Sequence, residues 1–100
     1  MYKVTTVFEK SDADVQYYLA TQPELRIEFS TFLSESTEIL TLNVVDESDT
    51  RQISEAFYAD ETMFNVFITR FNQQFPTFFA DRDAYHESVG VTTTRSATTV

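Results

Sequence analysis

The chain contains no cysteine and no tryptophan, and it has one histidine, one glycine and two prolines. Without cysteine it can form no disulfide, no thiolate nucleophile and no cysteine-ligated metal site. One glycine is too few for a glycine-rich phosphate-binding loop. One histidine leaves a single candidate base for any serine or threonine nucleophile. These absences remove the commonest catalytic sites, and the sequence favours a protein that is not an enzyme.

Long hydrophobic runs are absent as well. No apolar stretch approaches the roughly 18 residues of a membrane span, and no basic residue introduces an apolar segment near the start. We therefore expect no signal peptide and a cytoplasmic location. A chain of 100 residues corresponds to a single domain, 1–100, with no room for a second core.

Positive charge is scarce, because 7 basic residues stand against 16 acidic ones and the net charge is −9. A protein with this much negative charge repels phosphate groups, so we expect no direct nucleic-acid binding and no membrane binding. The acidic residues concentrate between Glu35 and Glu61. Their ordinary role is solubility. The alternative is an acidic interaction surface for a basic protein partner, with Asp46, Glu47 and Asp49 as its candidates.

The carboxylates do not form a metal-binding pattern. Asp12 and Asp14 are two positions apart, so on a helix they would not share a face. The segment 46–49 lacks both the ligand spacing and the glycine of a calcium-binding loop. We expect neither a metal nor a cofactor.

Phenylalanine, in contrast, is abundant. Seven of the 10 phenylalanines lie between Phe57 and Phe79, and most recur at steps of three and four residues. This is the period of one helix face, and an aromatic helix of this kind needs a sheet as its partner. Asp60 is the expected N-cap of this helix. Pro76 predicts a kink, or two helices that meet near Gln74.

Several other segments alternate as strands do. We expect strands at 2–9, 38–45, 51–58 and 91–100, with a loop of about five residues between the middle two. The intervening segment 23–34 fits either a strand or a helix, and a helix gives the simpler fold.

Two further signals concern helix ends. Ser11 and Asp14 have the form of a capping box and predict a helical segment after the first strand. Gly90 stands where a left-handed residue that ends the last helix is expected. The resulting order, β-α-β-β-α-β, predicts a ferredoxin-like α+β fold with a four-stranded antiparallel sheet and its helices on one face.

Neither face of the predicted sheet is purely polar. One face is expected to carry Tyr2, Val4, Leu40, Leu42, Ile53 and Phe57. The other is expected to carry Lys3, Val7, Ile39, Val45, Ala56 and Tyr58. Because an apolar surface of this size is rare on a monomer, we expect a homodimer that pairs through the sheet.

The segment Ile53-Ser-Glu-Ala-Phe-Tyr-Ala-Asp-Glu-Thr-Met-Phe-Asn-Val-Phe67 joins a hairpin strand to an acidic-capped helix. It resembles the dimeric α+β-barrel superfamily, which includes the antibiotic-biosynthesis-type monooxygenases. The resemblance implies two subunits paired sheet to sheet, each with a cavity between helices and sheet. In that case the chain is a cofactor-independent monooxygenase-like enzyme or a binder of a small lipophilic ligand. The candidate cavity residues are Tyr58, Phe64, Phe67, Phe71 and His86.

His86 has two interpretations. Haem-degrading members of this superfamily use a histidine late in the second helix, but the asparagine and tryptophan that accompany it are missing here. The ordinary interpretation is a protonated surface histidine near a helix end, paired with Asp83 or Glu87.

The segments 1–5, 82–85 and 90–94 resemble small proteins encoded by tailed phages of cyanobacteria. This resemblance implies a small acidic, non-catalytic accessory protein of the host cytoplasm, acting through protein–protein contacts. Such an interaction protein predicts a filled space between helices and sheet. An enzyme or ligand binder predicts a cavity there, with Tyr58 or His86 pointing into it.

Overall fold

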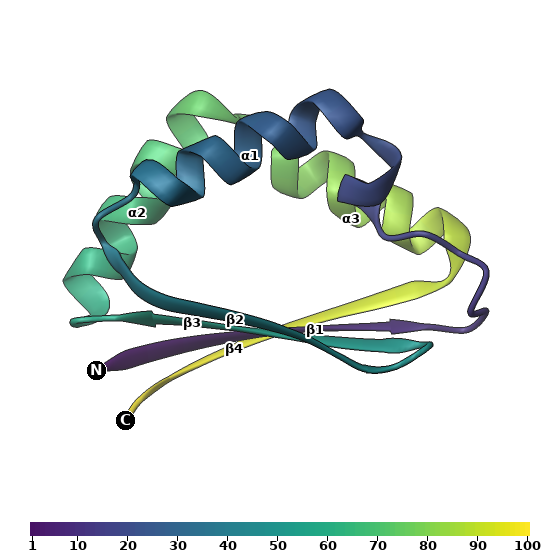
Figure 1. Ribbon diagram of the computed structural model, residues 1–100, viewed down its shortest axis with the longest axis horizontal. Helices are drawn as coiled ribbons and strands as arrows, with labels where there is room; N and C mark the ends of the chain where they lie inside the picture. Colours follow the sequence, from purple (N-terminus) through teal and green to yellow (C-terminus); the bar gives the residue numbers. More distant parts are fainter.

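The computed structural model describes residues 1–100 and has the expected ferredoxin-like α+β fold. Strands β1 (Tyr2–Lys10), β2 (Ile39–Ser48), β3 (Arg51–Tyr58) and β4 (Val91–Thr99) form an antiparallel sheet in the order β2-β3-β1-β4. The helices are α1 (Pro23–Glu35), α2 (Glu61–Gln74), α3 (Phe78–Val89) and a short 3-10 helix, η1 (Tyr18–Thr21). All of them lie on one side of the sheet (Figure 1). None is long and apolar enough to cross a membrane.

The predictions for the ends of α2 and α3 and for the segment 23–34 are confirmed. The Asp60 side chain caps α2 by accepting the backbone N–H of Met63 at 2.9 Å. Helix α2 ends just before Pro76 and α3 begins just after it, so the proline divides the aromatic stretch into two helices. Gly90 ends α3 in the left-handed region, with φ of 79°. The ambiguous segment is helical, as α1.

The capping box at Ser11 was the wrong interpretation, because no helix begins there. Instead, Oδ1 of Asp12 accepts the N–H of Asp14 at 2.9 Å, and the N–H of Ser11 donates to the carbonyl of Gly90. The short polar side chains thus form a turn rather than a helix start. Regular helical structure begins later, at η1.

The hairpin loop is also shorter than expected. Strand β2 continues to Ser48, so only Asp49 and Thr50 separate β2 from β3. Two residue pairs of the ladder support the extension: Asp46 lies opposite Gln52, whose Nε2 donates to Asp46 Oδ1 at 2.9 Å, and Ser48 lies opposite Arg51.

The predicted faces of the sheet are correct for β1 and wrong for β3. Ala56 lies opposite Val4 in the ladder, and both pack beneath the helices with Tyr58. Ile53 and Phe57 therefore point to the open face, away from the helices. Apolar residues occur at both odd and even positions of β3, which point to opposite faces of the sheet. The alternation pattern alone therefore could not assign the faces of this strand.

A register irregularity disturbs the start of β2. It falls between Ile39 and Thr41 and places Ile39 on the helix side together with Leu42, although the two were predicted on opposite faces. The remaining residue of this segment, Leu40, is exposed.

Phe71 holds the helix layer together. Its ring centre lies 5.7 Å from that of Phe29 and 5.6 Å from that of Phe32, both in α1. The rings of Phe78 and Phe79 in α3 are each 5.2 Å away. Most of these contacts are edge-to-face, the favoured geometry for aromatic pairs. One side chain from α2 therefore joins three helices, and it is only 2% exposed.

An ion pair connects α2 with the beginning of β2. The Arg70 guanidinium binds both carboxylate oxygens of Glu38, at 2.7 and 2.9 Å, and donates to Oγ of Ser36 at 3.0 Å. These hydrogen bonds to the charged form lower the pKa of the Glu38 carboxyl. The bidentate geometry fixes the loop that follows α1 against α2.

We predict that Phe71→Ala lowers the free energy of unfolding by about 3–5 kcal/mol, because a buried ring is replaced by a cavity. Val66→Ala is the control, since Val66 lies in the same helix and is 40% exposed; its effect should stay below about 1 kcal/mol. Urea denaturation followed by circular dichroism measures both. Equal effects of the two variants would contradict the central position of Phe71.

Candidate functional site

A cavity of about 440 Å³ lies between the helix layer and the sheet. We call it the helix–sheet cavity. All five residues proposed from the sequence line it: Tyr58, Phe64, Phe67, Phe71 and His86. The volume is within the range of small-molecule binding sites in proteins. Of the 27 lining residues, 19 are hydrophobic, so the cavity suits a largely apolar occupant.

The sheet contributes polar groups to the floor of this cavity. Ser54 lies opposite Thr6 in the ladder, and Thr6 lies opposite Arg95 on its other side. The three side chains form a polar row across β3, β1 and β4, and all three line the cavity. A sheet face that served only as a core would carry apolar residues at its centre.

Sequence reasoning missed this row. One signal was available, because Thr6 stands between Val4 and Phe8 on the same face of an alternating strand. A polar residue in the middle of such a face marks a position where the core is interrupted. The partners Ser54 and Arg95 could be found only from the register of the strands.

Tyr58 supplies a donor at the end of the cavity. Its side chain is 2% exposed, and its ring packs edge-to-face on Phe64 with the centres 5.1 Å apart. Burial raises the pKa of the Tyr58 hydroxyl to about 12; Glu38 adds to this shift, while the nearby Arg95 opposes it. The hydroxyl is therefore protonated at neutral pH and can donate a hydrogen bond.

His86 is not the surface histidine that the sequence suggested. It is 1% exposed, and its Nε2 accepts the backbone N–H of Tyr18 at 3.1 Å. Its Nδ1 lies 3.0 Å from Oγ1 of Thr93. Because Nε2 is an acceptor, the proton of the neutral ring is on Nδ1 and is donated to Thr93.

The sequence could not reveal this burial, because it depends on η1 folding back over α3 from a distant part of the chain. Asp83 does not pair with His86 but with Arg82, at 3.0 Å. Burial, followed by the positive charge of Arg82, lowers the pKa of the His86 ring, and Asp83 opposes the shift only in part. The neutral ring connects η1, α3 and β4.

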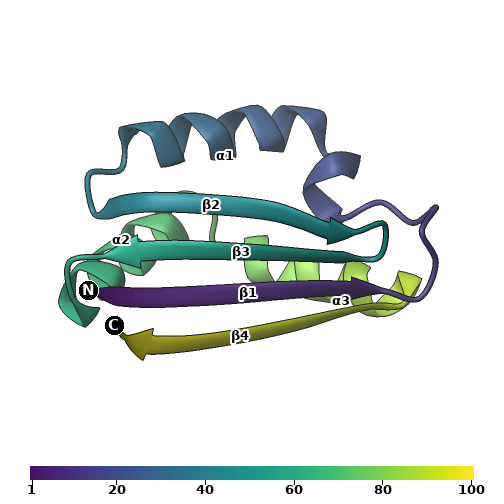
Figure 2. The same ribbon diagram turned by 60° about the horizontal axis from the view of Figure 1, so that its bottom comes forward.

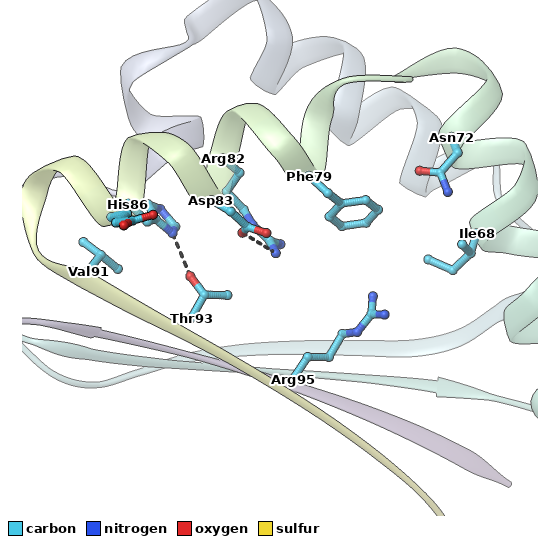
Figure 3. Close-up of a pocket in the computed structure, with 10 residues that line it drawn as sticks. Ile68, Asn72, Phe79, Arg82, Asp83, His86, Val91, Thr93 and Arg95 are labelled. Atoms are coloured by element: carbon cyan, nitrogen blue, oxygen red, sulfur yellow. Dashed lines mark hydrogen bonds and ion pairs between the residues drawn. The ribbon is translucent and has the colours of Figure 1, made fainter.

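A second hollow, of about 590 Å³, opens beside the cavity between α2, α3 and β4 (Figure 3). We call it the β4 pocket. Its polar members include Asn72, Thr93 and Asp83. Five residues line both the β4 pocket and the helix–sheet cavity: Ile68, Phe79, Arg82, His86 and Arg95. The two hollows therefore adjoin along α3 and β4.

The three acidic candidates lie toward the turn of the β2–β3 hairpin, and none of them lines either hollow. Glu47 pairs with Arg51 at 3.6 Å and Asp46 accepts from Gln52, whereas Asp49 lies in the exposed turn. An acidic interaction surface at this tip stays a prediction. No group of three or more histidine, aspartate or glutamate side chains is placed to hold a metal ion.

We predict that the pKa of the His86 ring in the folded protein lies below the ordinary 6.5, because the ring is buried and faces the positive charge of Arg82. The unfolded chain then binds a proton that the folded chain does not, so the free energy of unfolding falls as the pH drops below about 6.5. Nuclear magnetic resonance of the single histidine gives both its pKa and its tautomer. His86→Gln is the matched variant, and it should remove the pH dependence between about pH 7 and pH 5.5. A pKa at or above 6.5 for the folded protein would contradict the arrangement.

Comparison with known proteins relates the chain to others by fold. No protein-family model matches it, and no curated protein sequence matches it. Among solved structures, it is similar to a mutant form of SnoaB, a cofactor-independent oxygenase from Streptomyces nogalater. The TM-score is 0.61 at 12% identity, over 99% of this chain and 91% of the other. It is also similar to a dimeric ferredoxin-like protein from an uncultured marine organism, with a TM-score of 0.55 at 14% identity over 99% and 94% of the chains. At these identities the likeness establishes the fold that the chain shares with the two proteins.

Proposed function

We propose that the protein binds a small lipophilic molecule in the helix–sheet cavity. The observation that carries this proposal is the cavity itself, with its aromatic walls and the polar row in its floor. Apolar pockets with a few oriented polar groups are the usual form of small-molecule sites. Tyr58, Thr6 and Ser54 supply hydroxyl groups that can orient an occupant.

The cavity favours this function over that of a protein acting only through surface contacts, which predicts a filled interior. The fold shared with a cofactor-independent oxygenase is compatible with a reaction on the bound molecule. However, the one histidine uses both ring nitrogens in hydrogen bonds within the chain, so it is a poor candidate for a base. Binding is therefore the function that the geometry supports best. The resemblance to phage proteins stays a prediction that the comparisons do not support.

We predict that the neutral fluorescent probe N-phenylnaphthylamine binds saturably, at one site per chain. Ala56→Leu should abolish this binding because Ala56 lines the cavity and the larger side chain fills it. Ala97→Leu is the control, since Ala97 faces the same side from β4 but does not line the cavity. Fluorescence titration measures the affinity, and thermal denaturation verifies that both variants fold. Unchanged binding in a folded Ala56→Leu protein would contradict the proposed site.

We also propose that two copies pair through the open face of the sheet. The helices leave this face uncovered (Figure 1), and Val7, Ile53 and Val45 form an apolar row across its middle. Its charged residues are two basic, Lys3 and Arg51, and three acidic, Glu9, Glu55 and Glu47, the last of which pairs with Arg51. Two positive and three negative charges leave this face with a net charge of only −1 in a chain whose net charge is −9, so two copies can meet there without strong repulsion.

The size of this face is sufficient for a dimer. Four strands of about nine residues cover about 30 Å by 19 Å, or on the order of 600 Å² per copy. Two copies would then bury about 1,200 Å², which reaches the lower end of the range for specific interfaces. The dimeric ferredoxin-like protein found by structure comparison shows that this fold occurs as a dimer.

We predict a particle of about twice the 11.6 kDa chain mass in light scattering coupled to size-exclusion chromatography. Val45→Asp should convert it to a monomer by placing a charge in the apolar row. Val44→Asp is the matched control, because Val44 is equally exposed on the same strand but faces the helix side. A wild-type monomer, or equal effects of the two variants, would contradict pairing through the open face.

A further inference from the structure

The residues that line the helix–sheet cavity carry a net positive charge, whereas the whole chain carries a net negative charge. Three of the seven basic residues line it, and they are Arg26, Arg82 and Arg95. None of the 16 acidic residues does so. Arg82 is half-buried, and Arg26 and Arg95 lie exposed at the rim. Charges of one sign around a cleft raise the local concentration of ligands of the opposite sign. The interior therefore attracts anions, although the protein as a whole repels them.

Two of these arginines meet at the boundary between the two hollows. The guanidinium carbon of Arg82 lies 5.1 Å from the ring centre of Phe79, and that of Arg95 lies 5.9 Å from the same point. Arg82 extends from α3 toward the sheet, and Arg95 rises from β4 toward α3 (Figure 3). Both positive groups thus lie within 6 Å of one ring, and they reach the cavity from α3 and from β4.

The two arginines differ in their existing partners. Arg82 forms an ion pair with its neighbour Asp83, and its side chain is 15% exposed. Arg95 forms no ion pair, since the four ion pairs of the chain involve Lys3, Arg51, Arg70 and Arg82. Two carboxylates, Asp83 and Glu87, line the outer β4 pocket but not the cavity. Of the two arginines, Arg95 is thus the one whose hydrogen-bond donors are free to bind an anion at the boundary.

We infer that the ligand is an amphipathic anion, namely a small lipophilic carboxylic acid in its ionised form. This inference rests on the proposed binding function of the cavity. The apolar body of the acid lies among the aromatic rings, and its carboxylate lies at the boundary with the β4 pocket, bound by Arg95 and assisted by Arg82. The planar guanidinium matches a carboxylate with two parallel hydrogen bonds. Thr6, next to Arg95 in the polar row, offers a hydroxyl donor to the same end of the molecule.

The opposite rim of the cavity provides an internal control. Arg26 belongs to α1, which runs along the β2 edge of the sheet (Figure 2), whereas Arg95 lies on the β4 edge. Replacing either arginine by glutamine changes the net charge of the protein equally. A difference between the two variants therefore reports a local contact and not the general field.

Isothermal titration calorimetry with octanoate and with octanol tests the inference, because the two molecules share a chain and differ in charge. We expect wild-type protein to bind octanoate at least about tenfold more tightly than octanol. Arg95→Gln should weaken octanoate binding at least about tenfold and leave octanol binding within about twofold. Arg26→Gln should leave both affinities within about twofold. A general distortion of the cavity should change the affinities for octanoate and octanol alike, so their ratio still reports the contact with the carboxylate in a partly destabilised variant.

The outcomes separate the two proposals. If octanol binds as well as octanoate, or if Arg95→Gln leaves the ratio of the two affinities unchanged, the proposal of an anionic ligand is wrong. The proposed binding of lipophilic molecules is not affected by that result. If Arg26→Gln lowers the ratio as much as Arg95→Gln does, the placement of the carboxylate at the β4 edge is wrong. If neither compound binds, nor N-phenylnaphthylamine, the proposed function fails, and the inference fails with it.

Discussion

The three helices of this protein pack on one another through Phe71, and this contact holds the helix layer together. The Phe71 ring contacts phenylalanines of α1 and of α3, so the three helices form a layer that is stabilised by its own aromatic interior. A layer of this kind does not need every side chain of the sheet to fill the space below it. The cavity can persist because the helices are held together above it, and because Glu38 and Arg70 fix one end of that layer to the sheet.

The sequence predicted the parts of the fold that local chemistry decides. Asp60 caps α2, Pro76 separates two helices, and Gly90 takes a positive φ, because each effect involves only a few neighbouring residues. The predictions that failed depended on distant segments. The faces of β3 follow from its register with β1, and the burial of His86 follows from η1, which lies 68 positions earlier in the chain at Tyr18.

The candidate site could be predicted only in part, for the same reason. Periodicity placed Phe64, Phe67 and Phe71 on one helix face, and the resemblance to the α+β-barrel superfamily implied a cavity beside them, which these residues do line. The sequence could not show whether the space in front of that face is filled, since this depends on the separation of two layers. Nor could it show that Thr6, Ser54 and Arg95 form a row, because three strands far apart in the chain must first align.

The helix–sheet cavity also means that the stability of this protein depends on more than its sequence. Any molecule that occupies the cavity in the folded state, and does not bind the unfolded chain, adds RT ln(1 + [L]/Kd) to the free energy of unfolding. This is about 2.7 kcal/mol at a concentration one hundred times Kd, comparable with the burial of a large apolar side chain. An occupant therefore acts as a missing part of the hydrophobic core, and the melting temperature of the protein depends on which molecules surround it.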